Sequence, residues 1–280
     1  MRREAAPDRV SFDDFSPFWQ PFAPESCPGL YYVVAGIIEP KLEFWAIRAD
    51  LTESSLRIVV NDRGANQGPN MVQSTRVSSF VRDYGCLAGI NTVPFYPVSA
   101  IEGEERTCVG IVVSNGILIA APVPGYAALV FNRDGRAFII AQEEIEDLDA
   151  VENAVGGFRI ILLEGELPDR LLSDTGMPRQ DLPRHPRSAA GLSGDGKTLY
   201  LLVIDGRRPG SLGATEAETG LILERLGAAE GLNFDGGGSS ALALRFPDGR
   251  VRTVNTPVHG GIRGRERAVA ACLGLGAVEK

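Results

Sequence analysis

The chain has 280 residues, of which 44% are hydrophobic and 23% are charged, and its formal net charge is −8. This composition is typical of a soluble globular protein with one large domain or two small ones. The acidic balance argues against a general nucleic-acid binder, which needs a basic face. No run of about 18 apolar residues occurs, so we expect no membrane span.

The first 29 residues contain several prolines and aspartates with scattered aromatic residues. We predict an irregular N-terminal arm over residues 1–29 that packs on the body through Phe15, Phe18 and Trp19. The segment "MRREAAPDRVSFDDFSPFW" has no apolar h-region, so no signal peptide is visible in this chain. Without a strong linker after Leu30, residues 30–280 are expected to form one domain.

Strand signals dominate this domain. Segments 30–38, 42–51 and 56–61 are rich in β-branched and aromatic residues and end at polar breaks. Four dipeptides that favour tight hairpin turns lie between apolar runs: Asn115-Gly116, Asp134-Gly135, Asp195-Gly196 and Asp248-Gly249. We therefore predict an α+β fold, a single β-rich domain with a mixed or antiparallel sheet, many hairpins and about three helices.

Two of these helices have clear sequence signals. Residues 74–85 carry apolar side chains with helical spacing, with Ser74 or Thr75 expected to cap the start and Gly85 the end. Residues 215–227 begin with the T-x-x-E pattern of a capping box, Thr215 and Glu218, and end at Gly227.

The four cysteines, Cys27, Cys86, Cys108 and Cys272, include no C-x-x-C pair, so a zinc site of that kind is not expected. Buried free thiols are the preferred interpretation. An exported protein could hold one or two disulfides, and Cys86 with Cys108 is the first pair to test.

The segment "GLNFDGGGSSAL" places one carboxylate, Asp235, before three glycines and two serines. No lysine follows the glycines, so the segment is not a nucleotide P-loop. It predicts either a turn at the sheet edge or a loop whose N–H groups and hydroxyls bind an anion. The residues concerned are Gly236, Gly237, Gly238, Ser239 and Ser240.

Three further segments carry residues suited to chemistry. "RHPRSAAGL" holds Arg184, His185 and Arg187, and arginine pairs well with phosphate or carboxylate. Asp205 and Arg207 follow an apolar strand in "VIDGRRPG", and near the C-terminus "NTPVHGGIRGRERAVA" contains Asn255, His259, Glu266 and Arg267. Each segment alone is equally typical of a surface turn or a structural residue. Glu266 and Arg267 are adjacent, so in an extended chain they face opposite ways.

In this order, the segments between Asn153 and Gly274 closely resemble the phosphodiester glycosidase domain family. The matching segments are "HPRSAAGL" with Arg187, "IDGR" with Asp205 to Arg207, "GATEAE" with Thr215, "NFDGGGSS" with Asn233 to Ser240, "VNTP" with Asn255, and "RERAVA" with Glu266-Arg267. The most specific is "NFDGGGSS". Upstream, the family has Asn-Gly-Gly-Phe-Phe where this chain has Asn91-Thr92-Val93-Pro94-Phe95-Tyr96.

The resemblance implies a hydrolase that cleaves the C1–O bond of a sugar-1-phosphodiester and releases a phosphomonoester. It implies that Asp235 is the catalytic base or nucleophile and that Glu266 is a second acid or base. Asp205 and Thr215 would orient the other groups or bind sugar hydroxyls. Arg187 and Arg267 would hold the phosphate with Gly236, Gly237, Gly238, Ser239 and Ser240. Thr215, Asn91 and His185 complete the candidate substrate-binding residues.

The expected substrate is a GlcNAc-1-phosphodiester-like glycoconjugate or a cell-envelope polymer, and we expect an exported or periplasmic protein. The reaction needs no cofactor, although Asp235 and Glu266 could instead hold Ca²⁺ or Mg²⁺, because these ions prefer carboxylate oxygens. Two alternatives stay open. One is a non-catalytic glycan- or phosphopolymer-binding module, which the altered Asn91–Tyr96 segment favours, and the other is a metal-dependent phosphodiesterase.

Overall fold

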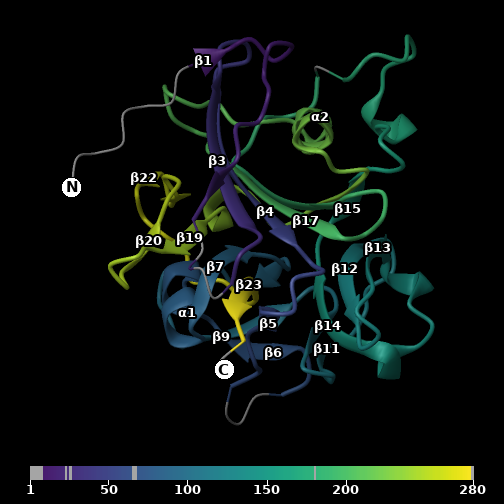
Figure 1. Cartoon of the computed structure of the whole chain (residues 1–280), viewed down its shortest axis with the longest axis vertical. Helices are drawn as coiled ribbons and strands as arrows, with labels where there is room; N and C mark the ends of the chain where they lie inside the picture. The colour runs from purple at the N-terminus through teal and green to yellow at the C-terminus, as the bar shows by residue number, and fades with distance from the viewer. Residues whose placement is uncertain (1–8, 23, 25–26, 65–67, 180, 279–280) are drawn as a thin grey trace.

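The computed structural model describes residues 9–22, 24, 27–64, 68–179 and 181–278 of the chain. A large sheet crosses the middle of the molecule, with helix α2 on one side and the smaller sheets and helix α1 on the other (Figure 1). The α+β, β-rich fold with mixed and antiparallel sheets is thus confirmed. Within the described part of the chain, no helix is long and apolar enough to cross a membrane.

The large sheet has eight strands in the order β1-β3-β4-β17-β16-β18-β15, with β2 also paired to β3. Its β1–β3 pair is parallel and its other pairs are antiparallel. The strands are β1 (Arg9–Val10), β2 (Gln20–Pro21), β3 (Leu30–Ile37), β4 (Leu42–Asp50), β15 (Arg159–Leu162), β16 (Arg187–Leu192), β17 (Thr198–Ile204) and β18 (Glu230–Asn233). Strands β16 and β17 are covered on both faces, which explains their nearly continuous apolar sequence.

Two five-stranded antiparallel sheets lie beside the large one. The first contains β5 (Leu56–Val60), β7 (Cys86–Asn91), β19 (Leu242–Arg245), β20 (Val251–Thr253) and β23 (Cys272–Ala277). The second contains β10 (Val112–Ser114), β11 (Ile117–Ala120), β12 (Ala127–Asn132), β13 (Ala137–Ala141) and β14 (Val151–Gly156). Smaller sheets are formed by β6 (Met71–Gln73), β8 (Phe95–Tyr96) and β9 (Glu105–Cys108), and by β21 (Val258–His259) and β22 (Ile262–Arg263).

All four predicted hairpin turns are confirmed. They connect β10 to β11, β12 to β13, β16 to β17 and β19 to β20, each an antiparallel pair. Their glycines Gly116, Gly135, Gly196 and Gly249 have φ values of 75°, 84°, 70° and 78°. Glycine adopts this left-handed region without a steric penalty, which is why these dipeptides predict turns.

The two faces of the large sheet pack against different partners. On one face, Leu201 and Phe234 belong to a buried cluster that also contains Ile90 of β7 and Leu273 of β23. On the other face, Phe44 is buried in a second cluster with apolar side chains of α2. The first cluster joins the large sheet to the sheet that contains β7, so residues at the ends of β7, β16 and β18 come close together.

The N-terminal arm is less irregular than its sequence predicts, because β1 and β2 extend the large sheet. Phe15 is buried and packs edge-on against Phe44 with ring centroids 5.2 Å apart. Trp19 packs against Tyr200, as expected. The expectation for Phe18 is wrong, since 76% of this residue is exposed.

The prediction of about three helices is wrong within the described residues, which contain two α-helices. They are α1 (Val77–Asp83) and α2 (Glu216–Leu226). Four short 3-10 segments accompany them: η1 (Gln142–Glu144), η2 (Leu148–Ala150), η3 (Asp169–Leu171) and η4 (Gly237–Ser239). All four cysteines are buried and free, so the preferred interpretation is confirmed and Cys86 is not bonded to Cys108.

Helix α2 begins and ends as predicted. The Thr215 side chain accepts a hydrogen bond from the Glu218 N–H, and the Glu218 side chain accepts one from the Thr215 N–H. Gly227 ends the helix with a φ of 110°. Thr215 is 1% exposed, so its hydroxyl serves the helix start.

Helix α1 begins differently, because its N-cap residue is Arg76. The hydroxyls of Ser74 and Thr75 donate to the carbonyls of Ile101 and Arg76, so neither caps the helix. Glu266 accepts hydrogen bonds from the Ser78 N–H at 2.9 Å and from the Ser78 hydroxyl at 2.7 Å. A carboxylate from a distant part of the chain therefore caps α1.

Replacement of Thr215 by alanine is expected to lower the free energy of unfolding by about 1 kcal/mol, because an N–H at the start of α2 loses its acceptor. The measurement is equilibrium denaturation in urea. Thr215→Ser is the matched control and should stay close to wild type, since serine caps equally well. An unchanged free energy of unfolding for Thr215→Ala would contradict the capping role.

Replacement of Glu266 by glutamine should also destabilise the fold, by about 1–2 kcal/mol, because Ser78 loses a charged acceptor. Glu146→Gln is the control, since Glu146 is exposed. Thermal and urea unfolding of both variants would measure the difference. A Glu266→Gln protein that unfolds like wild type would show that this carboxylate contributes little to α1.

Candidate active site

The candidate residues gather where strands of two sheets end. In the large sheet, the first residue of β16, Arg187, is paired with the last residue of β17, Ile204. The last residue of β18, Asn233, is paired with Ala189 of the same strand β16. In the neighbouring sheet, β7 ends at Asn91. The segments that leave these strand ends carry Asp235, Asp205 and Arg207.

Asn91 connects these segments through its buried side-chain amide. Its Nδ2 donates to the carbonyl of Asp235 at 2.6 Å. Its Oδ1 accepts from the Ser188 hydroxyl of β16 at 2.7 Å and from the Ala241 N–H at 3.1 Å. Asn91 therefore holds both ends of the glycine loop, which we define as residues 235–241. The amide expected to bind substrate is engaged with the protein itself.

The Asp235 side chain is half-buried at the start of the glycine loop. Its Oδ2 accepts a short hydrogen bond from the Ser239 hydroxyl, and Arg267 donates to that same hydroxyl at 3.0 Å. Burial raises the pKa of Asp235 from 3.8 to about 6, although the Ser239 hydrogen bond and the Arg267 charge act to lower it. A carboxylate with this pKa can exchange a proton near neutral pH.

The structure gives each glycine a physical reason. A β-carbon on Gly236 would lie 2.7 Å from the Pro186 carbonyl oxygen. On Gly237, where φ is 62°, it would lie 3.0 Å from an Arg207 nitrogen, and on Gly238 it would lie 2.5 Å from an Arg267 nitrogen. Two guanidinium groups therefore rest directly on the backbone of this loop, and a β-carbon at Gly237 or Gly238 would displace one of them.

The predicted nest of N–H groups is partly used within the protein. The N–H of Gly237 donates to Pro186, that of Ser239 to Gly236, and that of Ser240 to Gly237. Ser239 is bonded to Asp235, whereas the buried Ser240 hydroxyl has no hydrogen-bond partner among the described residues. These three N–H groups are therefore not free to form the predicted nest.

Arginine and histidine side chains surround the glycine loop. Arg207 is exposed and, within the described chain, its guanidinium has no hydrogen-bond or ion-pair partner. Burial is the main cause that lowers the pKa of His185, followed by the charges of Arg187 and Arg207. The pKa of Arg267 is also lowered, mainly by burial and further by the charge of Arg207. Asp235 is the carboxylate whose charge raises the pKa of Arg267. This local excess of positive charge favours an anion, despite the acidic total.

Arg187 is buried, whereas an arginine in a surface turn would be exposed. Its Nε donates to the Ala214 carbonyl at 2.9 Å and one Nη donates to that of Pro183 at 3.2 Å. Burial lowers its pKa. His185 exchanges two backbone hydrogen bonds with Ala214, at 3.1 and 2.9 Å. Arg187 and His185 thus fix the segment that enters β16 against the start of α2.

Asp205 is 1% exposed and both of its oxygens are occupied. Oδ1 accepts from Asn255 and from the Thr256 N–H, each at 3.0 Å, and Oδ2 accepts from Arg208 at 3.0 Å. Burial raises the pKa of Asp205, with Arg208 acting against it. Asn255 in turn donates to the Ser240 carbonyl at 3.1 Å. These contacts suit a positioning residue rather than one that contacts substrate.

Glu266 and Arg267 point in opposite directions, as their adjacency predicts. Arg267 donates to Ser239 beside Asp235, whereas Glu266 bonds Ser78 and accepts from the Thr253 hydroxyl at 3.0 Å.

The described residues contain no group of three His, Cys, Asp or Glu side chains arranged to hold a metal ion. Because Glu266 is bonded to Ser78 and Asp235 to Ser239, these two carboxylates do not meet as a shared pair of cation ligands.

The altered segment 91–96 lies beneath the glycine loop. The Thr92 carbonyl accepts from the Asp235 N–H at 2.8 Å, and both Thr92 and Val93 are buried. The Thr92 hydroxyl has no hydrogen-bond partner in the described structure. The Thr92 backbone therefore supports Asp235 from the interior, whereas the side chains of Thr92 and Val93 are buried.

Two neighbours of the loop have no predicted role in the site. Arg207 ends the "IDGR" segment, and its positive φ of 58° is not visible in the sequence. His259 belongs to "NTPVHGG", and its ring lies 3.1 Å from Arg267, measured from Nδ1 to Nε. Their link to the site depends on tertiary contacts with residues far away in the chain.

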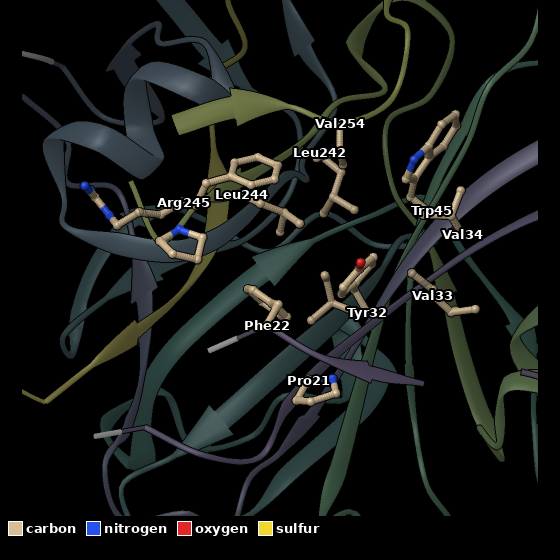
Figure 2. A pocket seen from close by; sticks show the side chains of 14 residues that line it. Pro21, Phe22, Tyr32, Val33, Val34, Trp45, Leu242, Leu244, Arg245 and Val254 are labelled. Carbon is tan, nitrogen blue, oxygen red and sulfur yellow. The ribbon is translucent and has the colours of Figure 1, made fainter. Parts of the chain in front are cut away.

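An apolar cavity of about 210 Å³ lies apart from these residues, between β3 and β4 on one side and β19 on the other. Figure 2 shows Tyr32 and Trp45 lining it together with Leu242 and Val254. No carboxylate lines it, and the Arg245 guanidinium donates to the carbonyls of Cys86 and Val81. The cavity is therefore mainly apolar, whereas charged side chains gather at the glycine loop.

A search of curated proteins finds no match to this chain. Among solved structures, the zebrafish N-acetylglucosamine-1-phosphodiester α-N-acetylglucosaminidase catalytic domain is 17% identical, with a TM-score of 0.64 over 95% of this chain and 89% of that one. A hypothetical Synechocystis protein is 16% identical with a TM-score of 0.62, and 94% of this chain covers 64% of it, which is less than two thirds of that protein.

A putative exported protein from Burkholderia pseudomallei is 15% identical, with a TM-score of 0.58 over 84% of this chain and 74% of that one. At these identities the three structures show a shared fold. The model of the phosphodiester glycosidase family matches residues 84–276, which is more than half of the chain and includes the glycine loop. The chain therefore belongs to the phosphodiester glycosidase family.

Proposed function

We propose that this protein hydrolyses the C1–O bond of a sugar-1-phosphodiester, with Asp235 as the catalytic carboxylate. The observation that carries the proposal is the contrast among the three candidate carboxylates. Asp205 and Glu266 each accept at least three hydrogen bonds from protein groups. Asp235 accepts fewer, from the Ser239 hydroxyl and the Gly236 N–H, and lies beside Arg267.

The chemistry matches a site with one available carboxylate. As the C1–O bond breaks, the bonding electron pair leaves with the phosphate, and the oxygen of water ends on C1. Asp235 either takes the proton from that water or bonds to C1 first and is then released by water. The departing phosphomonoester is already a good leaving group, so the reaction does not need a strong general acid.

Stabilisation of the departing phosphate is assigned to Arg207 and Arg267. Both guanidinium groups lie against the glycine loop, beside the Asp235 end. A single hydrogen-bond donor aimed at developing negative charge can lower the activation free energy by about 2.7–4 kcal/mol. Arg187 uses two of its nitrogens on carbonyls, so it contributes mainly through its charge.

The substrate class is taken from the family and from the zebrafish relative, whose name specifies N-acetylglucosamine-1-phosphodiester. We propose the same class of bond here, within a GlcNAc-1-phosphodiester-like glycoconjugate or a cell-envelope polymer. The local positive charge around Asp235 supports a substrate whose reactive part is anionic.

Hydrolysis of a GlcNAc-1-phosphate methyl diester in water enriched in ¹⁸O should place the heavy oxygen on the sugar and none on the methyl phosphate. Mass spectrometry of both products measures it. Label on the phosphate would mean P–O cleavage and a phosphodiesterase. Saturable binding of the diester without any product would mean a binding module. Either result overturns the proposal.

The rate should depend on pH through Asp235. Because the pKa of this side chain is raised to about 6, kcat/KM should rise with pH through this value as the carboxylate ionises, and fall up to tenfold per pH unit below it. Asp235→Asn should fold cooperatively and lose turnover at every pH. Ser239→Ala should move the midpoint to higher pH, since the lost hydrogen bond had lowered the pKa. A kcat/KM that does not depend on pH, or that is the same in these variants as in wild type, would contradict the role assigned to Asp235.

A further inference from the structure

His259 lies directly beside the glycine loop on a short hairpin. It ends β21, which pairs with β22 and packs against η4, the 3-10 segment that contains Gly238 and Ser239. Its backbone N–H donates to the Arg265 carbonyl at 3.1 Å, which fixes this part of the hairpin. The ring is half-buried. His259 is thus held next to the residues proposed to carry the reaction, although no role has been assigned to it.

The contact with Arg267 determines which ring nitrogen of His259 carries the proton. Arg267 Nε lies 3.1 Å from His259 Nδ1 and donates to it. A guanidinium group has donors and no acceptor, so Nδ1 must offer a lone pair. Burial, together with the charges of Arg267 and Arg265, lowers the pKa of His259 and so favours the neutral ring. The single proton of a neutral ring must then sit on Nε2.

The Nε2 donor has no hydrogen-bond partner among the described residues. His259 and Asp235 also occupy the two ends of one hydrogen-bonded series: Arg267 donates to His259 and to Ser239, and Ser239 donates to Asp235. A carboxylate at one end faces positive charge that develops on a sugar carbon. An N–H donor and a guanidinium at the other end suit the negative oxygens of a phosphate.

We propose that His259 is a further substrate-binding residue that donates a hydrogen bond from Nε2 to a phosphate oxygen of the substrate. This inference rests on the proposed function, since it names one more donor to the same phosphate. The competing explanation is that His259 acts only by holding Arg267 in place. The two explanations require different ring nitrogens, so they can be separated by substitution.

Two conservative variants separate these explanations. In His259→Asn, the side-chain oxygen can replace Nδ1 as the acceptor for Arg267, but the Nε2 donor is lost. In His259→Gln, the amide nitrogen can replace Nε2 as a donor, but the acceptor for Arg267 is lost. Ile262→Thr is the control on the same hairpin, because Ile262 is 52% exposed and has no assigned role in the site.

The first measurement is the tautomer of His259 by ¹⁵N NMR of histidine-labelled protein at neutral pH. The chain has two histidines, so a His185→Gln sample assigns both signals. Protonation at Nε2, with a hydrogen-free Nδ1, is expected. A proton on Nδ1, or a ring that is already doubly protonated, would overturn the inference without any reference to turnover.

The second measurement is the affinity for inorganic phosphate, by calorimetry with the same proteins. His259→Asn should weaken binding about tenfold, because one hydrogen bond to a charged group is lost. His259→Gln should recover most of that loss, and Ile262→Thr should bind like wild type. Stronger weakening by Gln than by Asn would assign His259 to the support of Arg267, and unchanged binding in both would remove it from the site.

These outcomes differ from a failure of the proposed function. If the enzyme binds phosphate through His259 but places ¹⁸O on the phosphate product, His259 is a phosphate donor and the proposed C1–O cleavage is wrong. If the diester is cleaved at C1–O and His259→Asn still binds phosphate normally, the proposed cleavage is supported and His259 is not a donor.

Discussion

Much of the site depends on one buried amide, the side chain of Asn91. Its three hydrogen bonds join the end of β7, strand β16 of the large sheet, and both ends of the glycine loop. A buried amide must find such partners, because an unpaired one costs about 1–3 kcal/mol. The position of Asp235 is therefore set by the way two sheets meet, and the loop cannot move independently of them. This explains why Asn91 matters to the site although its own amide is engaged with the protein.

Opposing electrostatic effects act on the carboxylate that this amide positions. Burial raises the pKa of Asp235, while Ser239 and Arg267 act to lower it. The result, about 6, leaves the side chain ionised at neutral pH but poorly solvated, which makes it a better base or nucleophile than an exposed aspartate. Arg267, whose charge favours the ionised form, rests on the backbone of the glycine loop beside Arg207. A protein with a net charge of −8 can thus present a cationic site, because a few side chains decide the local field.

The sequence predicts the local features of this fold well and the distant contacts poorly. The four turn dipeptides and the Thr215–Glu218 capping box act within a few residues, and all are confirmed. The start of α1 was predicted wrongly, because its cap comes from Glu266, 188 residues further along the chain from Ser78. The family pattern names Asp235, Arg267 and Asp205 as parts of one site. It does not say that Glu266 points away from Asp235, or that Arg207 lies on Gly237, since both facts depend on how remote segments pack.

Asp205 shows how a site can extend far beyond the residues that contact substrate. Its carboxylate is paired with Arg208, which also bonds Glu43 of β4, and Glu43 is in turn bonded by Arg9 of β1. On its other side Asp205 holds Asn255, which fixes the Ser240 carbonyl at the end of the glycine loop. Buried charges lose solvation and add little net stability when paired, yet removal of one partner is strongly unfavourable. A network of this kind is therefore better explained by geometry than by stability: it fixes the loop relative to β1, so the N-terminal arm becomes part of the support for Asp235.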